Sequence, residues 1–273
     1  MEEINKTIPE LILRIQGIDV SKYEGTFLSK SIQKRMSETH CDTLDDYDCL
    51  LQSQEEEAEH LIDSLQISYT EFFRNPLTFS VLEKIVIPNI VARNASSHRN
   101  EIRIWSAACA AGQETYSLAM LLKEFSNGYP EEINFRIFAT DQSESQIRDA
   151  QLGQYPESAL NCLSLKRVNR WFKRRGGNYT VREELKKNIE FSVFDLFNKQ
   201  YSCPPTSIFG DFDLIVCANL LFYYRPKFRK KIIEKAGNCL ATNGYLITGE
   251  TERDILMQSG FQEVYPQSAI FQI

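Results

Sequence analysis

The chain has 273 residues, of which 42% are hydrophobic and 25% are charged. These values are typical of soluble globular proteins and exclude the disordered, collagenous and fibrous classes. No apolar run approaches the length that spans a bilayer, and the first residues are acidic where a signal peptide is basic. We therefore expect a cytoplasmic protein with no membrane insertion.

The cysteine and histidine content restricts the possible chemistry. The seven cysteines form an odd set without a Cys-x-x-Cys pair, so we expect neither a disulfide framework nor a zinc site, and no other metal site is indicated. The chain has three histidines, and none lies in a recognisable catalytic motif. An enzyme with this sequence would have to work without a histidine base.

Charge is distributed unevenly along the chain. Residues 1–66 contain 15 acidic and six basic residues, whereas the rest of the chain carries 22 acidic and 25 basic residues. Residues 165–187 alone hold nine basic residues against two acidic ones. This basic stretch is either a solvated surface or a surface that attracts an acidic partner at long range.

The first part of the chain has the periodicity of short amphipathic helices. Ile8, Leu11, Ile12 and Ile15 share one helical face, and a second apolar series runs from Leu44 to Leu51. No strand pattern is visible there. We predict an all-α N-terminal domain over residues 1–75.

From residue 76 onward, strand patterns alternate with helix patterns. A helix with Pro76 in its first turn comes first, and further helices are expected at residues 114–125, after Ser143 and from Pro226. Strands are expected at residues 102–105, 133–139, 189–193, 212–218, 245–248 and 269–273. This alternation predicts an α/β fold with a largely parallel sheet and helices on both faces.

Residues 155–188 interrupt the alternation. A basic helical stretch is followed by Gly176-Gly177-Asn178, which favours a turn, and by a short run of strand-forming residues. We predict a small inserted β-subdomain that contains a hairpin.

Three of the predicted strands end in loops suited to binding a ligand. In a doubly wound sheet, ligands bind beyond the carboxyl ends of the strands. The loop Ser106–Gly112 lacks both the G-x-G-x-x-G pattern and the Walker lysine, which argues against NAD and nucleoside triphosphates. Asp141 either accepts hydrogen bonds from ribose hydroxyls or caps the next helix. Asn219 follows another apolar strand, and its amide could hold a ligand.

Several motifs, taken in order, resemble those of the chemotaxis receptor methyltransferases. They are Thr70-x-Phe72-Phe73-Arg74, Arg103-x-Trp105-Ser106-Ala107-Ala108-Cys109-x-x-Gly112-x-Glu114-x-Tyr116-Ser117, Ala139-Thr140-Asp141, Gly153-x-Tyr155, Gly177-x-Tyr179-x-Val181, Phe212-Asp213-x-Ile215-x-Cys217-x-Asn219 and Gly244-x-Leu246-x-x-Gly249-x-Thr251-Glu252. Each motif alone is weak, but their order and spacing across the chain make the resemblance specific.

The resemblance implies a fold, an activity and a partner. It implies a Rossmann-like S-adenosylmethionine-dependent methyltransferase domain over residues 76–273, with an inserted small antiparallel β-subdomain at about 155–188 and a small all-α N-terminal domain before it. The implied enzyme is a protein-glutamate O-methyltransferase of chemotaxis adaptation, which methylates cytoplasmic helices of chemoreceptors and releases S-adenosyl-L-homocysteine. We expect no binding of nucleic acid, because the net charge is negative and no Asn/Asp-Pro-Pro-Tyr/Phe motif follows the fourth strand. We also expect a monomer.

The resemblance also assigns site residues. The implied cofactor contacts are Ser68, Thr70, Arg74, Glu114, Asp141, Asp195, Leu196, Asn219 and Leu220. In our hypothesis Glu114 pairs with the methionine amino group and Asp141 holds the ribose. Arg74 and Tyr223 are the expected catalytic residues: Arg74 binds the cofactor carboxylate or steers the substrate glutamate, and Tyr223 orients the accepting carboxylate. No base is required, because glutamate is already ionised at neutral pH.

Two departures from the family pattern leave alternatives open. Asparagine is usual where Ser68 and Asp195 stand, and residues 28–36 keep three basic residues where the family has an arginine-rich helix. The alternatives are a methyltransferase of the same fold that acts on another signalling protein, and a non-catalytic adaptor that binds S-adenosylmethionine. Retention of Arg74, Glu114, Asp141 and Asn219 favours catalysis over the adaptor.

Overall fold

The computed structural model describes residues 4–65, 69–97, 99, 101–127, 133–207 and 210–272. The chain divides into two compact units. The first unit is Met1–Ile67 together with Leu220–Lys230, and the second is Ser68–Asn219 together with Lys231–Ile273. The first unit therefore includes a short segment that is distant in sequence from the rest of it.

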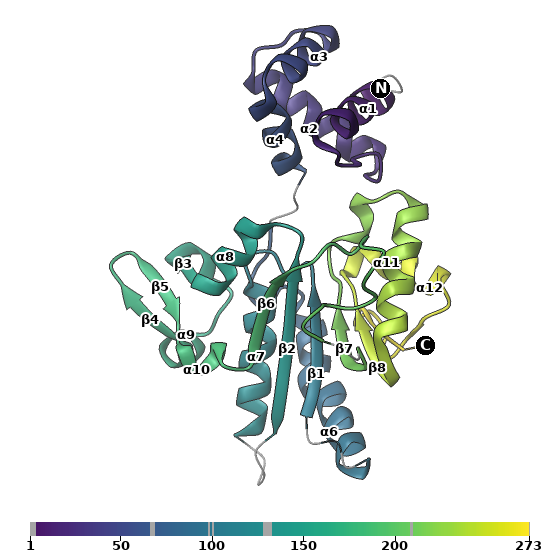
Figure 1. The fold of residues 1–273 in the computed structure, drawn as a ribbon. Helices are drawn as coiled ribbons and strands as arrows, with labels where there is room; N and C mark the ends of the chain where they lie inside the picture. The colour runs from purple at the N-terminus through teal and green to yellow at the C-terminus, as the bar shows by residue number, and fades with distance from the viewer. Residues whose placement is uncertain are drawn as a thin grey trace. The chain divides into compact units, whose positions relative to one another are not determined.

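The first unit contains the predicted helices (Figure 1). They are α1 (Ile4–Gln16), α2 (Gly25–Glu38), α3 (Leu44–Ser53) and α4 (Glu55–Ser64). Ile8, Leu11 and Ile12 of α1 are buried, as their spacing predicted, and Tyr47 and Leu51 of α3 are also buried. The prediction of an all-α N-terminal region is confirmed.

A polar network inside the first unit binds Arg35, one of the three basic residues at positions 28–36. The Arg35 guanidinium binds the buried Glu57 carboxylate, with its Nε donating at 2.9 Å, and Tyr47 Oη donates to the same carboxylate at 2.8 Å. Burial alone would raise the pKa of Glu57, but the hydrogen bonds from Arg35 and Tyr47 outweigh it and lower that pKa. Arg35 is thus an internal ion-pair partner, and the exposed basic residues of α2 are Lys30 and Lys34.

The second unit is built on a seven-stranded sheet with the order β6-β2-β1-β7-β8-β10-β9. Its strands are β1 (Glu101–Ala107), β2 (Asn134–Asp141), β6 (Ile189–Val193), β7 (Phe212–Val216), β8 (Leu240–Ile247), β9 (Gln262–Glu263) and β10 (Ile270–Gln272). The first five in the sheet order run parallel, and β10 and β9 pair antiparallel at the end. The α/β fold with a largely parallel sheet is confirmed, and the two-residue strand β9 was not predicted.

The helices of the second unit cover a sheet that is buried on both faces. They are α5 (Pro76–Val81), a π-helical segment (Leu82–Val86), α6 (Ile87–Ser96), α7 (Gln113–Ser126), α8 (Glu144–Leu152), α11 (Pro226–Cys239), which extends from the first unit, and α12 (Arg253–Gln258). Ile104 joins the large apolar core with α6 and α7, and the next residue, Trp105, contacts the rings of Phe194 and Phe212. Because neighbouring strand residues point to opposite faces, β1 contributes to two apolar layers.

The predicted insertion forms a separate three-stranded antiparallel sheet with the order β3-β5-β4. Its elements are β3 (Gln154–Pro156), a 3-10 turn (Glu157–Leu160), α9 (Leu165–Trp171), β4 (Phe172–Arg175), β5 (Asn178–Val181) and α10 (Glu183–Lys186). Phe72 packs edge-on against Tyr155 and Phe172. Arg167 Nε and Nη2 both donate to Glu124 Oε2 of α7, at 3.0 and 2.8 Å. The insertion is thereby fixed to the main sheet domain.

The described part of the chain has neither a membrane-spanning helix nor a candidate metal cluster. No helix there is long and apolar enough to cross a bilayer. The same residues contain no cluster of three histidine, cysteine, aspartate or glutamate side chains that could hold a metal ion. All seven cysteines are free thiols.

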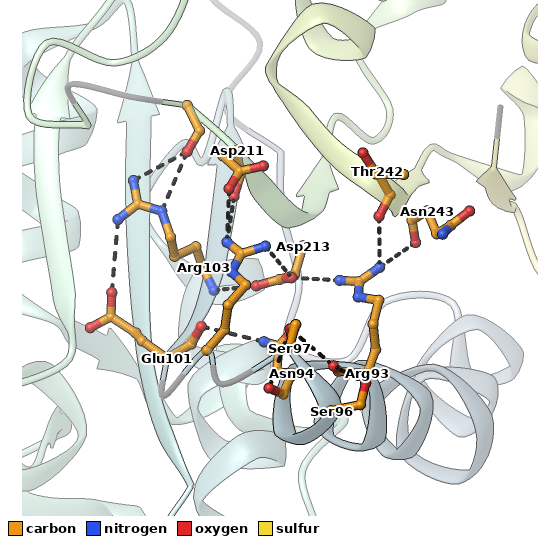
Figure 2. Close-up of polar contacts among 12 residues, drawn as sticks. Arg93, Asn94, Ser96, Ser97, Glu101, Arg103, Asp211, Asp213, Thr242 and Asn243 are labelled. Carbon is orange, nitrogen blue, oxygen red and sulfur yellow. Dashed lines mark hydrogen bonds and ion pairs between the residues drawn. The ribbon is translucent and has the colours of Figure 1, made fainter.

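A buried aspartate organises the amino ends of the strands (Figure 2). Asp213 of β7 is fully buried and accepts hydrogen bonds from the Arg93 guanidinium and from the Arg103 backbone N–H at 2.9 Å. Arg99 adds an ion pair at 3.6 Å, and Arg93 also donates to the Asn243 carbonyl in β8. This cluster ties α6 to β1, β7 and β8.

We expect Asp213→Asn to lower the free energy of unfolding by roughly 2–4 kcal/mol, because the partly buried guanidiniums of Arg93 and Arg99 lose their fully buried counter-charge. Asp211→Asn is the matched control, since Asp211 pairs with Arg99 but is more than half exposed, and its loss should cost under about 1 kcal/mol. Urea denaturation of both variants measures the difference. Equal losses of stability in the two variants would contradict the role of Asp213 as the buried counter-charge of this cluster.

Candidate active site

The candidate site lies at the carboxyl edge of the parallel strands. β1 has β2 on one side and β7 on the other, so the strand order reverses at β1. In open α/β sheets this reversal is where loops separate and ligands bind. Asp141 is the last residue of β2, and the other predicted residues, Glu114, Asp195 and Asn219, come after the carboxyl ends of β1, β6 and β7.

The loop after β1 has an unusual backbone. Ala108 and Ala110 have φ values of 61° and 47°, and Gly112 has a φ of 90°. A Cβ on Gly112 would meet the Ala150 Cβ at 3.0 Å, so this position requires glycine for space as well as conformation. Small side chains let the loop fold back closely, and the Cys109 N–H donates to the Thr140 carbonyl at 2.9 Å.

Asp141 holds this loop through its buried carboxylate. One oxygen accepts from the Ala110 N–H and the other from the Ser143 N–H, both at 2.9 Å. Burial raises the pKa of Asp141, and the backbone N–H groups of Ser143 and Ala110 act against that rise. The N-cap of α8 is Ser143, which accepts from the Gln146 N–H, so the alternative interpretation of Asp141 as that helix's cap is wrong.

Glu114 lies in the first turn of α7 and has its charge largely desolvated. Ser106 Oγ donates to Glu114 Oε1 at 3.0 Å, and Thr115 Oγ1 donates to Ser106 Oγ at 3.1 Å. Burial raises the pKa of Glu114 to about 7; the hydrogen bond from Ser106 and the positive charge of Arg74 lower it, while the negative charge of Glu252 raises it further. Near neutral pH the carboxyl is therefore divided between its two protonation states.

Glu252 is a site residue whose role the sequence analysis missed. Its carboxylate is fully buried, and Oε2 accepts from the Asn219 N–H at 2.8 Å, from Thr248 Oγ1 at 2.8 Å and from the Gly249 N–H at 2.9 Å. These bonds hold Asn219 in a left-handed conformation with a φ of 58°. Glu252 is the last residue of the last matched motif, and that motif was the signal in the sequence that could have identified it as a site residue.

Arg74 is positioned by the aromatic residues before it. Phe72 is fully buried, and the Phe73 N–H donates to Ser117 Oγ at 2.9 Å, which ties the segment to α7. The Arg74 guanidinium lies over the Tyr69 ring at 5.2 Å and donates to the Tyr69 carbonyl at 3.4 Å. Arg74 also lines an open groove of about 690 Å³ together with Phe73. Tyr69 was not predicted as a site residue.

The remaining predicted cofactor contacts in the second unit lie near this edge or beside it in sequence. The Phe194 N–H donates to the Asp141 carbonyl at 2.8 Å, which places the following residues, Asp195 and Leu196, next to the end of β2. Asp195 is exposed, Leu196 is partly buried, and Thr70 is half-buried four residues before Arg74. Ser68 lies outside the described residues.

Two predicted site residues belong to the first unit. Leu220 is buried, and Tyr223 is half-buried at the end of a 3-10 turn formed by Leu221–Tyr223. The peptide bond between Asn219 and Leu220 is where the chain passes from one unit to the other. The roles assigned to Leu220, Tyr223 and the other site residues stay predictions.

We expect Glu114→Gln to stabilise the cofactor-free protein at pH 8 by about 1–3 kcal/mol. The folded chain binds the Glu114 proton more tightly than the unfolded chain does, so the wild type loses stability as pH rises from its ordinary pKa of 4.5 to about 7. Glutamine has no proton to lose. Denaturation curves at pH 5 and pH 8 measure the effect, which should be small at pH 5.

Glu144→Gln is the matched control, because Glu144 is exposed at the start of α8. Its effect should stay within about 0.5 kcal/mol at both pH values. The stability difference between Glu114→Gln and the wild type should grow from pH 5 to pH 8. A difference that stays constant would contradict the raised pKa of Glu114.

Comparison with known proteins matches the chain to one family. Residues 68–269 match the family model described as CheR methyltransferase, SAM binding domain, and residues 6–65 match CheR methyltransferase, all-alpha domain. The chain is 33% identical over 196 residues to the chemotaxis protein methyltransferase of Borreliella burgdorferi, covering 70% of this chain and 66% of that protein. It is 29% identical over 253 residues to that of Salmonella typhimurium, covering 90% of this chain and 82% of that protein.

A longer relative also matches. The chain is 31% identical over 262 residues to an uncharacterized 104.1 kDa protein of Rhodobacter capsulatus. The match covers 96% of this chain and 27% of that protein. The chain therefore spans about a quarter of the Rhodobacter protein.

Proposed function

Because the chain belongs to the CheR methyltransferase family, we propose that it is an S-adenosylmethionine-dependent protein-glutamate O-methyltransferase acting on cytoplasmic helices of chemoreceptors. Relatives of this chain are named chemotaxis protein methyltransferases. The observation that carries the proposal is the placement of two carboxyls, the half-buried Glu114 and the buried Asp141, around the small-residue loop where the strand order reverses.

These residues fit S-adenosylmethionine. The Glu114 carboxyl, with a pKa of about 7, would be drawn to its ionised form by the ammonium of a methionine group. The Asp141 oxygens are fixed by two backbone N–H groups and keep lone pairs that can accept from ribose hydroxyls. Ala108 and Ala110 have only methyl side chains, so no long side chain of the loop stands in the way of a ligand. When bound, this cofactor supplies a methyl group on a positively charged sulfur.

The reaction suits a site without a general base. A substrate glutamate with an ordinary pKa of ~4.3 is ionised at neutral pH, so no proton has to be removed before the methyl group is transferred. What the chain must supply is alignment of the accepting carboxylate, which is worth up to ~7–11 kcal/mol in favourable cases. We assign this alignment to Arg74, which lines an open groove, and to the Tyr223 hydroxyl.

The charge pattern suggests how the substrate is reached. Exposed basic residues cluster on α9 and β4 of the inserted subdomain: Lys166, Arg170, Lys173, Arg174 and Arg175. This surface suits an acidic partner by long-range attraction. Because Arg35 is paired internally, α2 presents Lys30 and Lys34. The reduced charge of α2 favours, as a second candidate, the same reaction on another signalling protein.

We expect radiolabelled S-adenosylmethionine and chemoreceptor-bearing membranes of the source cell to give a product that releases volatile methanol in mild alkali. Arg74→Ala should lower kcat by about 10- to 100-fold, because the acceptor is no longer aligned. Arg136→Ala is the matched control: Arg136 is half exposed at the opposite edge of the sheet and pairs with Glu190. Label that survives alkali, or an Arg74→Ala variant of full activity, would contradict the proposal.

We expect the affinity for S-adenosylhomocysteine to weaken about tenfold as pH falls from 8 to 6, because the fraction of ionised Glu114 falls with it. The Glu114 pKa of about 7 places the transition inside this window. Glu114→Gln should bind more weakly and show no such pH dependence. Calorimetric titration of both proteins tests this, and an identical slope in the glutamine variant would rule out Glu114 as the titrating group.

A further inference from the structure

The segment that carries Tyr223 is held by the N-terminal helical unit. Leu220–Lys230 belongs to the same compact unit as α1–α4, although its chain neighbour Asn219 belongs to the sheet unit. Tyr23 and Tyr224 form an isolated antiparallel β-bridge. The catalytic tyrosine of our proposal therefore lies on a short segment whose partners come from the start of the chain.

Backbone hydrogen bonds fix this segment on both sides of the bridge. The Glu24 N–H donates to the Tyr223 carbonyl at 2.8 Å, and the Arg225 N–H donates to the Lys22 carbonyl at 3.0 Å. Arg225 Nε also donates to the Tyr23 carbonyl at 3.0 Å. The backbone on either side of Tyr224, at the Tyr223 carbonyl and the Arg225 N–H, is thus paired with residues 22–24.

Ring contacts fix the side chains. Phe27 meets the Tyr223 ring edge-on with centroids 4.8 Å apart, and Tyr23 stacks on Tyr224 at 5.1 Å with an interplanar angle of 18°. Tyr23 and Phe27 also contact each other at 5.6 Å. Aromatic pairs of these geometries add stability beyond the apolar area they bury.

Glu24 connects these contacts to helix α2. It is the N-cap of α2, and its carboxylate accepts from the N–H groups of Thr26 at 2.8 Å and Phe27 at 3.1 Å. The same residue donates its own N–H to the Tyr223 carbonyl. The start of α2 and the position of Tyr223 are therefore set by one residue.

We propose that the N-terminal helical unit is a positioning element for methyl transfer, with Phe27 acting through Tyr223. This inference rests on the proposed function, in which the Tyr223 hydroxyl orients the accepting carboxylate. Phe27 orients the Tyr223 ring, and the Glu24 N–H fixes the position of the Tyr223 carbonyl. The unit thus contributes to the rate of the reaction in addition to any role in docking.

The test is a double-mutant cycle on the full chain, with labelled S-adenosylmethionine and chemoreceptor-bearing membranes of the source cell. We expect Tyr223→Phe, which keeps the ring, to lower kcat about tenfold or more, and Phe27→Ala to lower it to a similar degree. In the Tyr223→Phe background Phe27→Ala should change kcat less than about twofold, because the hydroxyl that it positions is already absent. Affinity for S-adenosylhomocysteine should change less than about twofold throughout.

Ile32→Ala controls for general loss of stability. Ile32 is a fully buried residue of the same helix, so its truncation should lower the Tm of the unit, and kcat should remain near the wild-type value below that transition. Comparison of Tm values shows whether Phe27→Ala acts by partial unfolding.

Three outcomes overturn the inference, and they are distinguishable. If Tyr223→Phe lowers kcat and Phe27→Ala does not, the positioning role is wrong while the proposed function stands. If the two losses add, or if Ile32→Ala lowers kcat as much as Phe27→Ala, Phe27 does not act through Tyr223. A Tyr223→Phe enzyme with full kcat would remove the role of Tyr223 itself and the inference with it.

Discussion

Two buried carboxylates, Asp141 and Glu252, accept hydrogen bonds from backbone N–H groups and so hold together the loops at the carboxyl ends of the strands. Asp141 binds the loop after β1, and Glu252 binds Asn219, three residues beyond the end of β7. A buried donor that loses its acceptor costs about 1–3 kcal/mol, so neither carboxylate can be removed without leaving several N–H groups unsatisfied. The left-handed conformations of Ala110 and Asn219 persist because these acceptors compensate for their backbone strain.

The two ends of the same strands have opposite energetic roles. At the amino end, Asp213 is paired with arginine side chains and a backbone N–H, and it stabilises the fold. At the carboxyl end, burial raises the pKa of Glu114, so ionising it in the absence of ligand opposes folding. A stable end and a strained end on one sheet are typical of binding sites, where complementarity to the ligand competes with stability.

Local patterns predicted much of the fold, and long-range pairing accounts for what they missed. β6 lies at the predicted residues because it is a compact strand-forming run, whereas the two-residue β9 has no period to detect. Apolar spacing predicted the helix after Pro76 but not its π-helical segment. The ordered motifs indicated the loop after β1 and Asp141. They did not indicate that Arg35 is paired with Glu57, 22 residues away, because that pairing depends on how the helices pack.

A reaction that moves no proton from its acceptor places its whole demand on alignment. The span between Asn219 and Tyr223 is therefore a sensitive part of the molecule. Glu252 fixes the Asn219 N–H at one end of this span, and Glu24 fixes the Tyr223 carbonyl at the other. Residues 220–222 lie between these two fixed positions in the sequence. Alignment errors near 1 Å are enough to lower a rate substantially, so we expect the rate to depend on the contacts that hold the segment of Tyr223.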